Sequence, residues 1–270
     1  MNGLSRRRLI GAGLAATGTA LVTGGSAGPH RRPATVPAAS TDPVAAPATS
    51  PPPAPSPTAT ALPAQERPVF TLSEYRRLVP GPAFPGNAVA LTIDDGPHPT
   101  WTPKVLRLLE RYHVPALFCL IGNQVLGHET VARDIVAAGH QVANHTWSHP
   151  GKIAHLAQDR VQQEIDRAQN KIYDATGKLP AIFRSPGGAV SPAVFAAAAQ
   201  ARMLPINWTN DPRDWTRPGT RSITDRLLAA RPGQILLCHD GGGDRAQTCA
   251  ALETVIPALQ SRGYQFVVLS

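Results

Sequence analysis

The sequence lacks several features that would assign a protein to a class at once. Only three of its 270 residues are cysteines, an odd number that cannot pair completely within one chain. After Arg67 there is no dense basic run and no alternation of basic with aromatic residues, so we expect no nucleic-acid partner. No internal repeat is visible. A folded part of some 190 residues buries roughly 70% of its unfolded surface and needs no disulfide staples.

The three cysteines differ in their surroundings. Cys119 lies in the apolar run 116–121 and is expected to be a buried strand residue. Ten residues separate Cys238 from Cys249, and these two cysteines either pair or stay free, because spacing alone does not fix the geometry that a disulfide needs.

Residues 1–27 have the composition of an export signal. Arg6, Arg7 and Arg8 precede an uncharged stretch from Gly11 to Val22, which is too short and too rich in glycine for a comfortable membrane span. The run Ser-Arg-Arg-Arg-Leu-Ile resembles a twin-arginine signal, with a general secretory signal as the alternative. We therefore expect the twin-arginine export machinery as a partner and a secreted or cell-envelope protein. Whether the signal is cleaved or kept as an anchor stays open.

Residues 28–68 are expected to form a disordered tether. The stretch from Pro29 to Pro68 holds 12 of the 28 prolines, mixed with alanine, serine and threonine and almost no large apolar residue, so it cannot build a core. Without the five arginines of residues 1–32 and the two acids of residues 33–66, the formal charge of +8 falls to +5. That excess supports at most a mild attraction to an anionic wall polymer.

Residues 69–270 are expected to form one folded domain with an α/β fold. The strands predicted from short apolar runs are 88–93, 116–121, 141–143, 181–183, 204–207, 234–237 and 265–269. The helices predicted from apolar periodicity are 103–112, 129–138, 156–176, 192–200, 223–231 and 246–262, with Pro257 expected to bend or interrupt the last. This alternation indicates a parallel sheet, either open or closed into a barrel.

Two adjacent carboxylates, Asp94 and Asp95, stand where the first of these strands meets the turn Asp-Gly-Pro. Sites in α/β folds gather at strand ends. Successive strand side chains point to opposite faces, but a turn that starts at Asp95 can bring both carboxylates toward one pocket. Taken alone, such a pair is more often a loop-capping feature.

His145 and His149 follow another predicted strand. They would share one face if the segment turned helically. Alone, this spacing is about as often an ordinary surface pair as a site. With a carboxylate from another strand end, the histidines complete a two-His, one-Asp set that leaves coordination positions open.

The other polar motifs also stand at strand ends. They are Arg184-Ser185-Pro186-Gly187-Gly188, then Asp211-Pro212-Arg213-Asp214-Trp215, and Leu237-Cys238-His239. Glycines let backbone N–H groups approach a ligand, and an arginine can hold a carboxylate through two hydrogen bonds.

Together and in this order, the motifs resemble those of the polysaccharide deacetylases of carbohydrate esterase family 4, over residues 89–270. The resemblance implies a distorted (β/α) barrel of about seven strands and the metal-assisted removal of an acetyl group from a sugar. It also implies these roles: Asp94 the catalytic base, braced by Arg184; Asp95, His145 and His149 the metal ligands; His239 the general acid, tuned by Asp214; Trp215 and Leu237 the walls of an acetyl pocket.

One residue departs from the family pattern. Gly187 stands where the third motif usually has a bulky aromatic residue, so one wall of the substrate groove would be missing. Its backbone N–H can still donate to an oxyanion, because that role needs no side chain.

The sequence thus predicts a monomeric, metal-dependent hydrolase that removes N-acetyl groups from N-acetylglucosamine units of peptidoglycan or a chitin-type polysaccharide. Zinc suits two imidazoles and a carboxylate best, although cobalt or nickel would accept the same ligands. Two alternatives remain: an acetylxylan esterase, and a wall-binding module that has lost turnover.

Overall fold

The computed structural model describes residues 65–269, so the export signal predicted at 1–27 and nearly all of the tether predicted at 28–68 lie outside the described residues. The strands of the described part are β1 (Ala88–Asp94), β2 (Leu117–Leu120), β3 (Gln141–Asn144), β4 (Ile182–Phe183), β5 (Leu204–Pro205), β6 (Ile235–His239) and β7 (Gln265–Phe266). Its α-helices are α1 (Leu72–Leu78), α2 (Trp101–Tyr112), α3 (Gly122–Val125), α4 (Glu129–Ala137), α5 (Gln158–Thr176), α6 (Pro192–Gln200), α7 (Thr220–Leu228) and α8 (Ala246–Ser261). Three short 3-10 helices lie at Ile153–His155, Pro186–Gly188 and Asp214–Thr216.

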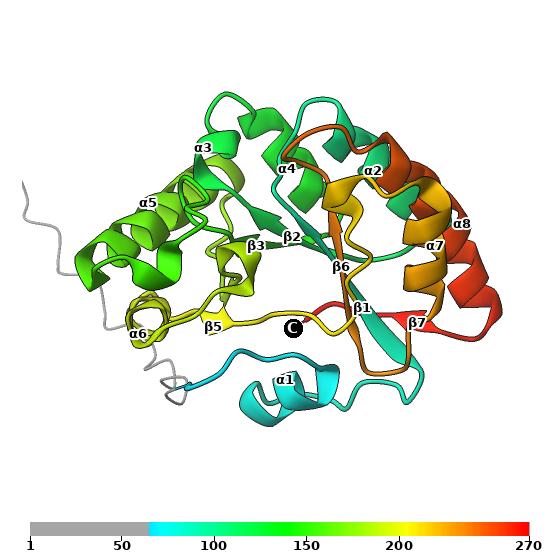
Figure 1. Cartoon of the computed structure of the whole chain (residues 1–270), viewed down its shortest axis with the longest axis horizontal. Helices are drawn as coiled ribbons and strands as arrows, with labels where there is room; N and C mark the ends of the chain where they lie inside the picture. Colours follow the sequence, from blue (N-terminus) through cyan, green and yellow to red (C-terminus); the bar gives the residue numbers. More distant parts are fainter. Residues whose placement is uncertain (1–64, 270) are drawn as a thin grey trace, which may run out of the picture. The chain divides into compact units, whose positions relative to one another are not determined.

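The strands form one parallel sheet in the order β5-β4-β3-β2-β1-β6, and β7 pairs with the first two residues of β1. In the register of this sheet Asp94 lies opposite Cys119 of β2 and opposite His239 of β6. Because all pairs are parallel, the carboxyl ends of the strands meet at the same edge. The helices surround the sheet, with α5 and α6 near β3–β5 and with α2, α7 and α8 on the side of β1 and β6 (Figure 1).

A short segment before α1 joins the two edge strands. Val69 makes a parallel bridge to Ile206, directly after β5, and Thr71 makes an antiparallel bridge to Gln234, directly before β6. Thr71 also caps α1, since its side chain accepts the N–H of Glu74 while Glu74 accepts the N–H of Thr71. The sheet is thereby closed into a distorted barrel, which confirms the predicted fold class.

Alternation along the strands separates an outer from an inner core. In β1, Val89, Leu91 and Ile93 pack outward under the helices, whereas Ala88 and Ala90 pack into the barrel. Asp94 falls on the inner set by the same alternation. The base predicted from the sequence therefore lies at the mouth of the barrel.

Some predicted elements differ from the observed ones. Helix α7 runs from 220 to 228 rather than from 223 to 231, and neither α1 nor α3 was expected. Helix α8 continues through Pro257 without interruption. Proline has no N–H to donate to the carbonyl of Glu253, but the hydroxyl of Tyr112 donates to that oxygen instead, at 3.2 Å.

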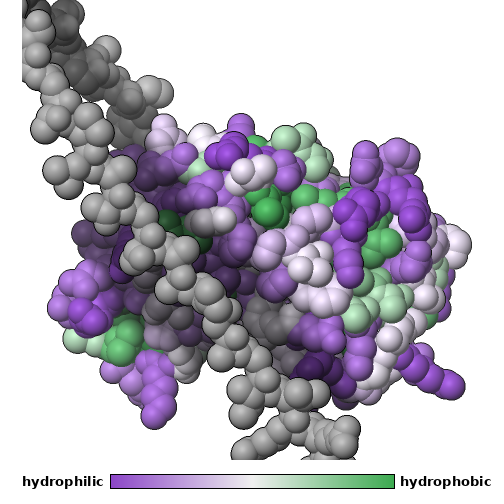
Figure 2. Space-filling model, turned by 90° about the horizontal axis from the view of Figure 1, so that it is seen from above, coloured by the Kyte–Doolittle hydropathy of each residue, from purple (hydrophilic) through white to green (hydrophobic). Residues whose placement is uncertain are grey.

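No helix in the described part of the chain combines the length and apolar character needed to cross a bilayer. The face drawn in Figure 2 is largely hydrophilic, with apolar side chains in separate small patches. Scattered patches of this kind are ordinary on protein surfaces and need no partner.

We expect the segment that closes the barrel to be essential for stability. A chain that begins at Gln65 should unfold at the same denaturant concentration as the full chain, whereas a chain that begins at Gly81 loses Val69, Leu72 and Tyr75, which are 2 to 4% exposed. At ~1.5–3 kcal/mol for each buried side chain, its free energy of unfolding should fall by about 5 kcal/mol or more. Urea titration followed by circular dichroism measures this difference, and equal midpoints for the two shortened chains would contradict it.

Candidate active site

A fully buried ion pair holds the predicted base. The guanidinium of Arg184, which has no exposed surface, donates from Nη1 to Asp94 Oδ1 at 2.7 Å and to the hydroxyl of Thr92 at 2.8 Å. Its Nη2 donates to the carbonyl of Asn207 at 3.1 Å. Because these contacts take Oδ1 of Asp94, its other oxygen, Oδ2, remains for chemistry.

The neighbouring carboxylate turns toward the same mouth because the chain leaves β1 in a left-handed conformation. Asp95 has a φ of 74°, which a non-glycine residue adopts only at some cost. Burial alone would raise the pKa of Asp95, but the imidazoles of His145, His239 and His149 hold it well below its usual value. Asp95 is therefore an ionised carboxylate. As expected for a turn that starts at Asp95, both carboxylates face one place: His145 Nε2 lies 3.8 Å from Asp94 Oδ2 and 3.5 Å from Asp95 Oδ1.

His145 and His149 come together through a turn and not through a helix. Thr146 and His149 have φ values of 68° and 55°, and the segment contains no helical residue. Side chains stabilise this turn: Asn144 accepts the N–H of Thr146 at 2.9 Å, and the hydroxyl of Thr146 accepts the N–H of His149 at 3.1 Å. The structure therefore brings the two predicted histidines together through a turn, and not through the helical spacing considered from the sequence.

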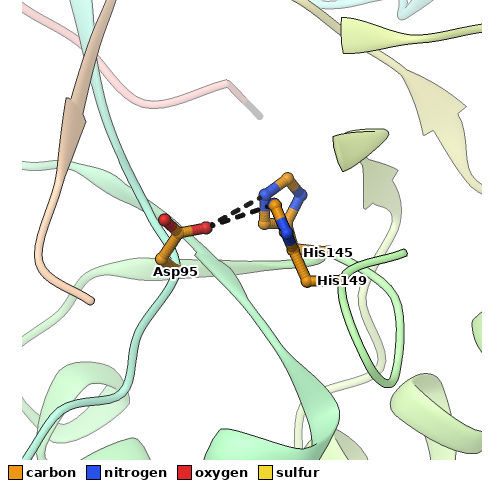
Figure 3. Close-up of side chains that lie close together, drawn as sticks. All are labelled: Asp95, His145 and His149. Atoms are coloured by element: carbon orange, nitrogen blue, oxygen red, sulfur yellow. Dashed lines mark ion pairs between the residues drawn. The ribbon is translucent and has the colours of Figure 1, made fainter. Parts of the chain in front are cut away.

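These two imidazoles face Asp95 (Figure 3). The Nε2 atoms of His145 and His149 each lie 3.5 Å from Asp95 Oδ1, and the three candidate ligand atoms lie within 4.8 Å of one another. Asp95 Oδ1 is buried and has no hydrogen-bond partner among the described residues. His145 donates from Nδ1 to the carbonyl of Arg184 at 2.7 Å, which leaves the Nε2 lone pair free. The set fits a divalent cation bound by one carboxylate and two neutral imidazoles.

A second imidazole–carboxylate pair stands on the other side of β1. His239, at the end of β6, directs Nδ1 to Asp214 Oδ1 at 2.7 Å, and its backbone N–H donates to Asp214 Oδ2 at 2.9 Å. Burial alone would lower the pKa of His239, but the hydrogen bond and the charge of Asp214 raise it to about 9. His239 therefore carries a proton at neutral pH, and Nε2 is left to donate it.

The remaining predicted residues, Gly187, Trp215 and Leu237, differ in their exposure. Gly187 has a φ of 60°, and a Cβ there would meet no atom within 4 Å, so the position is open. Among the described residues its N–H makes no hydrogen bond. Trp215 is 50% exposed, whereas Leu237 is buried two residues before His239 on the same face of β6.

Four polar residues at the site were not predicted from the sequence. Thr92 and Thr248 hold Arg184 and Asp214 through their hydroxyls. Asp240 is fully buried and accepts from Thr102 at 2.5 Å, and burial raises its pKa to about 7. Arg245 is almost fully buried near Asp95. Only Asp240 had a signal in the sequence, because it directly follows His239.

Cys119, Cys238 and Cys249 are free, so Cys238 and Cys249 do not pair.

The fold and the site together define an α/β-barrel enzyme with acid and base groups beside a candidate metal centre. A family model described as polysaccharide deacetylase matches residues 82–206. The peptidoglycan-N-acetylglucosamine deacetylase of Bacillus cereus is 39% identical over 185 residues, which cover 67% of this chain and 86% of that protein. A chitooligosaccharide deacetylase of Sinorhizobium fredii is 40% identical over 203 residues, covering 71% of this chain and 94% of that protein.

A solved structure agrees with these relatives. The crystal structure of a peptidoglycan N-acetylglucosamine deacetylase in complex with a naphthyl N-hydroxybenzamide superposes with a TM-score of 0.66 at 29% identity, covering 74% of this chain and 89% of that one. The chain belongs to the polysaccharide deacetylase family, carbohydrate esterase family 4. It is a hydrolase of that family, as the motifs predicted.

We expect Asp214 to be the cause of the raised pKa of His239. In the metal-free Asp214→Asn variant the counter-charge is lost while burial still disfavours the imidazolium, so the pKa should fall from about 9 toward the ordinary 6.5 or below it. NMR titration of the His239 ring measures this value. Thr248→Val, which removes only a hydrogen bond to Asp214, is the control and should leave the pKa high. An unchanged pKa in Asp214→Asn would contradict the assignment.

Proposed function

We propose that the chain is a metal-dependent deacetylase that removes N-acetyl groups from N-acetylglucosamine units of peptidoglycan or of a chitin-type polymer. One observation carries the proposal: a carboxylate held by Arg184 and an imidazole held by Asp214 stand on two neighbouring strands, next to the Asp95, His145 and His149 set. The relatives named for peptidoglycan and for chitooligosaccharides support the two substrate classes.

Asp95, His145 and His149 are the residues that would hold the metal. A divalent cation, when bound, supplies positive charge that polarises an acetyl carbonyl and lowers the pKa of water. Zinc is our first choice for this donor set, with cobalt or nickel as substitutes.

Asp94 acts as the base in this proposal. Its Oδ2 accepts the proton of the attacking water, while Oδ1 stays bound to Arg184. That ion pair prevents the carboxylate from rotating, because the Arg184 side chain is itself fully buried and is held by Thr92 and Asn207. General-base assistance of this kind contributes about 10²–10⁴-fold to the rate.

The acid and the oxyanion donor complete the reaction. The N–H of Gly187 donates to the oxygen that becomes negative when water adds to the acetyl carbon. His239 then gives its proton to the leaving nitrogen while Asp214 keeps the imidazole in the orientation required. The products are acetate, which contains the oxygen of the attacking water, and a glucosamine unit, whose nitrogen has left the cleaved amide bond.

The N-terminal sequence supports a place of action outside the cytoplasm. We propose that the twin-arginine signal at residues 1–27 exports the folded enzyme, and that residues 28–68 separate it from its point of attachment or release. Wall polysaccharides lie on that side of the membrane, which fits the proposed substrate.

Acetate release is the decisive test. The metal-loaded enzyme should release acetate from N-acetylated chitin oligomers, from peptidoglycan or from both. Release from acetylated xylan alone would replace the proposal with O-deacetylation. No release from any of the three would favour a wall-binding module without turnover, which co-sedimentation with purified wall would then detect.

The two adjacent aspartates should respond differently to the same substitution. Asp94→Asn removes the base but leaves the three proposed ligands, so metal should be retained while kcat falls about 10²–10⁴-fold. Asp95→Asn replaces a carboxylate ligand with a weaker amide, so metal affinity should fall first. Metal content measured beside activity, with and without added zinc, separates the two effects.

Excess zinc should restore part of the activity of Asp95→Asn and none of that of Asp94→Asn. Thermal unfolding of both variants controls for folding, because Asp94→Asn also leaves Arg184 with a neutral partner. Metal kept by Asp95→Asn and lost by Asp94→Asn would reverse the assignment of the two residues.

A further inference from the structure

The loop that follows β6 packs directly against the back of Asp95. A Cβ added to Gly241 would overlap the backbone oxygen of Asp95, and one added to Gly242 would lie 2.9 Å from Asp95 Oδ2. Oδ2 is the carboxylate oxygen that does not face His145 and His149. The metal-ligand set and this loop therefore contact opposite sides of the same carboxylate.

Arg245, at the start of α8, stands behind that loop. It is 3% exposed, and its Nε donates to the carbonyl of Gly241 at 2.6 Å. Its terminal nitrogens make no hydrogen bond among the described residues. The other buried arginine at the site, Arg184, has an aspartate at 2.7 Å, whereas Arg245 has no carboxylate within 4.0 Å in the described part of the chain.

The Arg245 guanidinium and the Asp95 carboxylate both lie close to the place that a side chain on Gly242 would occupy. The Cβ position of Gly242 lies 3.1 Å from Arg245 Nη2 and 2.9 Å from Asp95 Oδ2. The two atoms are therefore at most about 6 Å apart, a separation that one bridging water spans. A guanidinium cannot lose its proton, and a buried charge without a counter-charge is costly. Asp95, which is ionised, supplies the counter-charge.

We propose that Arg245 is a positioning residue for Asp95, and that it holds Oδ2 through a bridging water so that Oδ1 stays turned toward His145 and His149. This inference rests on the proposed metal centre. Carboxylates that bind metals are commonly fixed by hydrogen bonds to their other oxygen, and loss of such a partner costs about 10–100-fold in metal affinity or activity.

Two effects of Arg245 oppose each other, and the proposal requires one to dominate. The guanidinium orients Asp95, which favours metal binding, but its charge also repels a cation at the same site. If orientation dominates, removing Arg245 weakens binding. If repulsion dominates, removing Arg245 strengthens binding.

The test compares metal affinity in full-length, metal-free variants. Arg245→Met removes the charge and the hydrogen bonds, and Arg245→Lys keeps the charge but loses the planar fork. The matched control is Arg262→Met, because Arg262 lies at the other end of α8 and also donates to a backbone carbonyl, that of Leu228 at 2.7 Å. Zn²⁺ titration against a chromophoric chelator gives the dissociation constants, and Co²⁺ absorption reports the coordination number.

The proposal predicts dissociation constants about 10–100-fold higher for Arg245→Met than for wild type, a smaller rise for Arg245→Lys, and none for Arg262→Met. The Co²⁺ bands of Arg245→Met should also change in intensity, because a freed carboxylate can bind through both oxygens. A purely structural role would lower the unfolding temperature of the metal-free protein without changing the bands.

Unchanged or tighter metal binding in Arg245→Met would overturn the inference. If Arg245→Met does not fold, Arg245→Lys decides in the same way, because unchanged affinity in that variant also overturns it. A wild-type chain that binds neither Zn²⁺ nor Co²⁺ would overturn the metal centre, and this inference with it. A wild type that binds metal as tightly as Arg245→Met overturns the inference alone.

Discussion

The site depends on the buried pair of Arg184 and Asp94. Two charges without contact with water are tolerated when each satisfies the other and further donors find acceptors. Here the hydroxyl of Thr92 accepts from Nη1 and the carbonyl of Asn207 accepts from Nη2, while Nε has no partner among the described residues. The pair joins β1 to the segments after β4 and β5. The carbonyl of Arg184 also fixes the ring of His145. One residue therefore positions both the proposed base and a proposed metal ligand.

The distribution of charge around this pair explains how acid and base can coexist within one mouth. Asp95 is ionised and His239 is protonated, since each has the opposite charge close by. Asp240 is fully buried and lies near the like-charged Asp95 and Asp94, so its pKa rises to about 7. Carboxylates within one site thus differ in protonation because their partners differ.

Several local features take their form from distant residues. His145 and His149 meet through a strained turn that Asn144 and Thr146 stabilise, and not through helical spacing. Helix α8 passes through Pro257 because Tyr112 of α2 satisfies the carbonyl that proline leaves unpaired. Strands β4 and β5 have only two residues each, shorter than their apolar runs indicate, since pairing requires a neighbour as well as a suitable sequence.

The sequence by itself determined the α/β class, the positions of most strands and helices, and the residue types at the strand ends. Those properties are local, because period, turn residues and motif order are all contained in short segments. Only the tertiary structure decided that Val69 and Thr71 close the barrel, that Cys238 and Cys249 stay apart, and that Arg245 stands behind Asp95. Each of these facts depends on which atoms from distant segments come within a few ångströms of each other. A local sequence pattern predicts which residues are buried and which conformation they adopt, but it does not predict which distant residues come into contact.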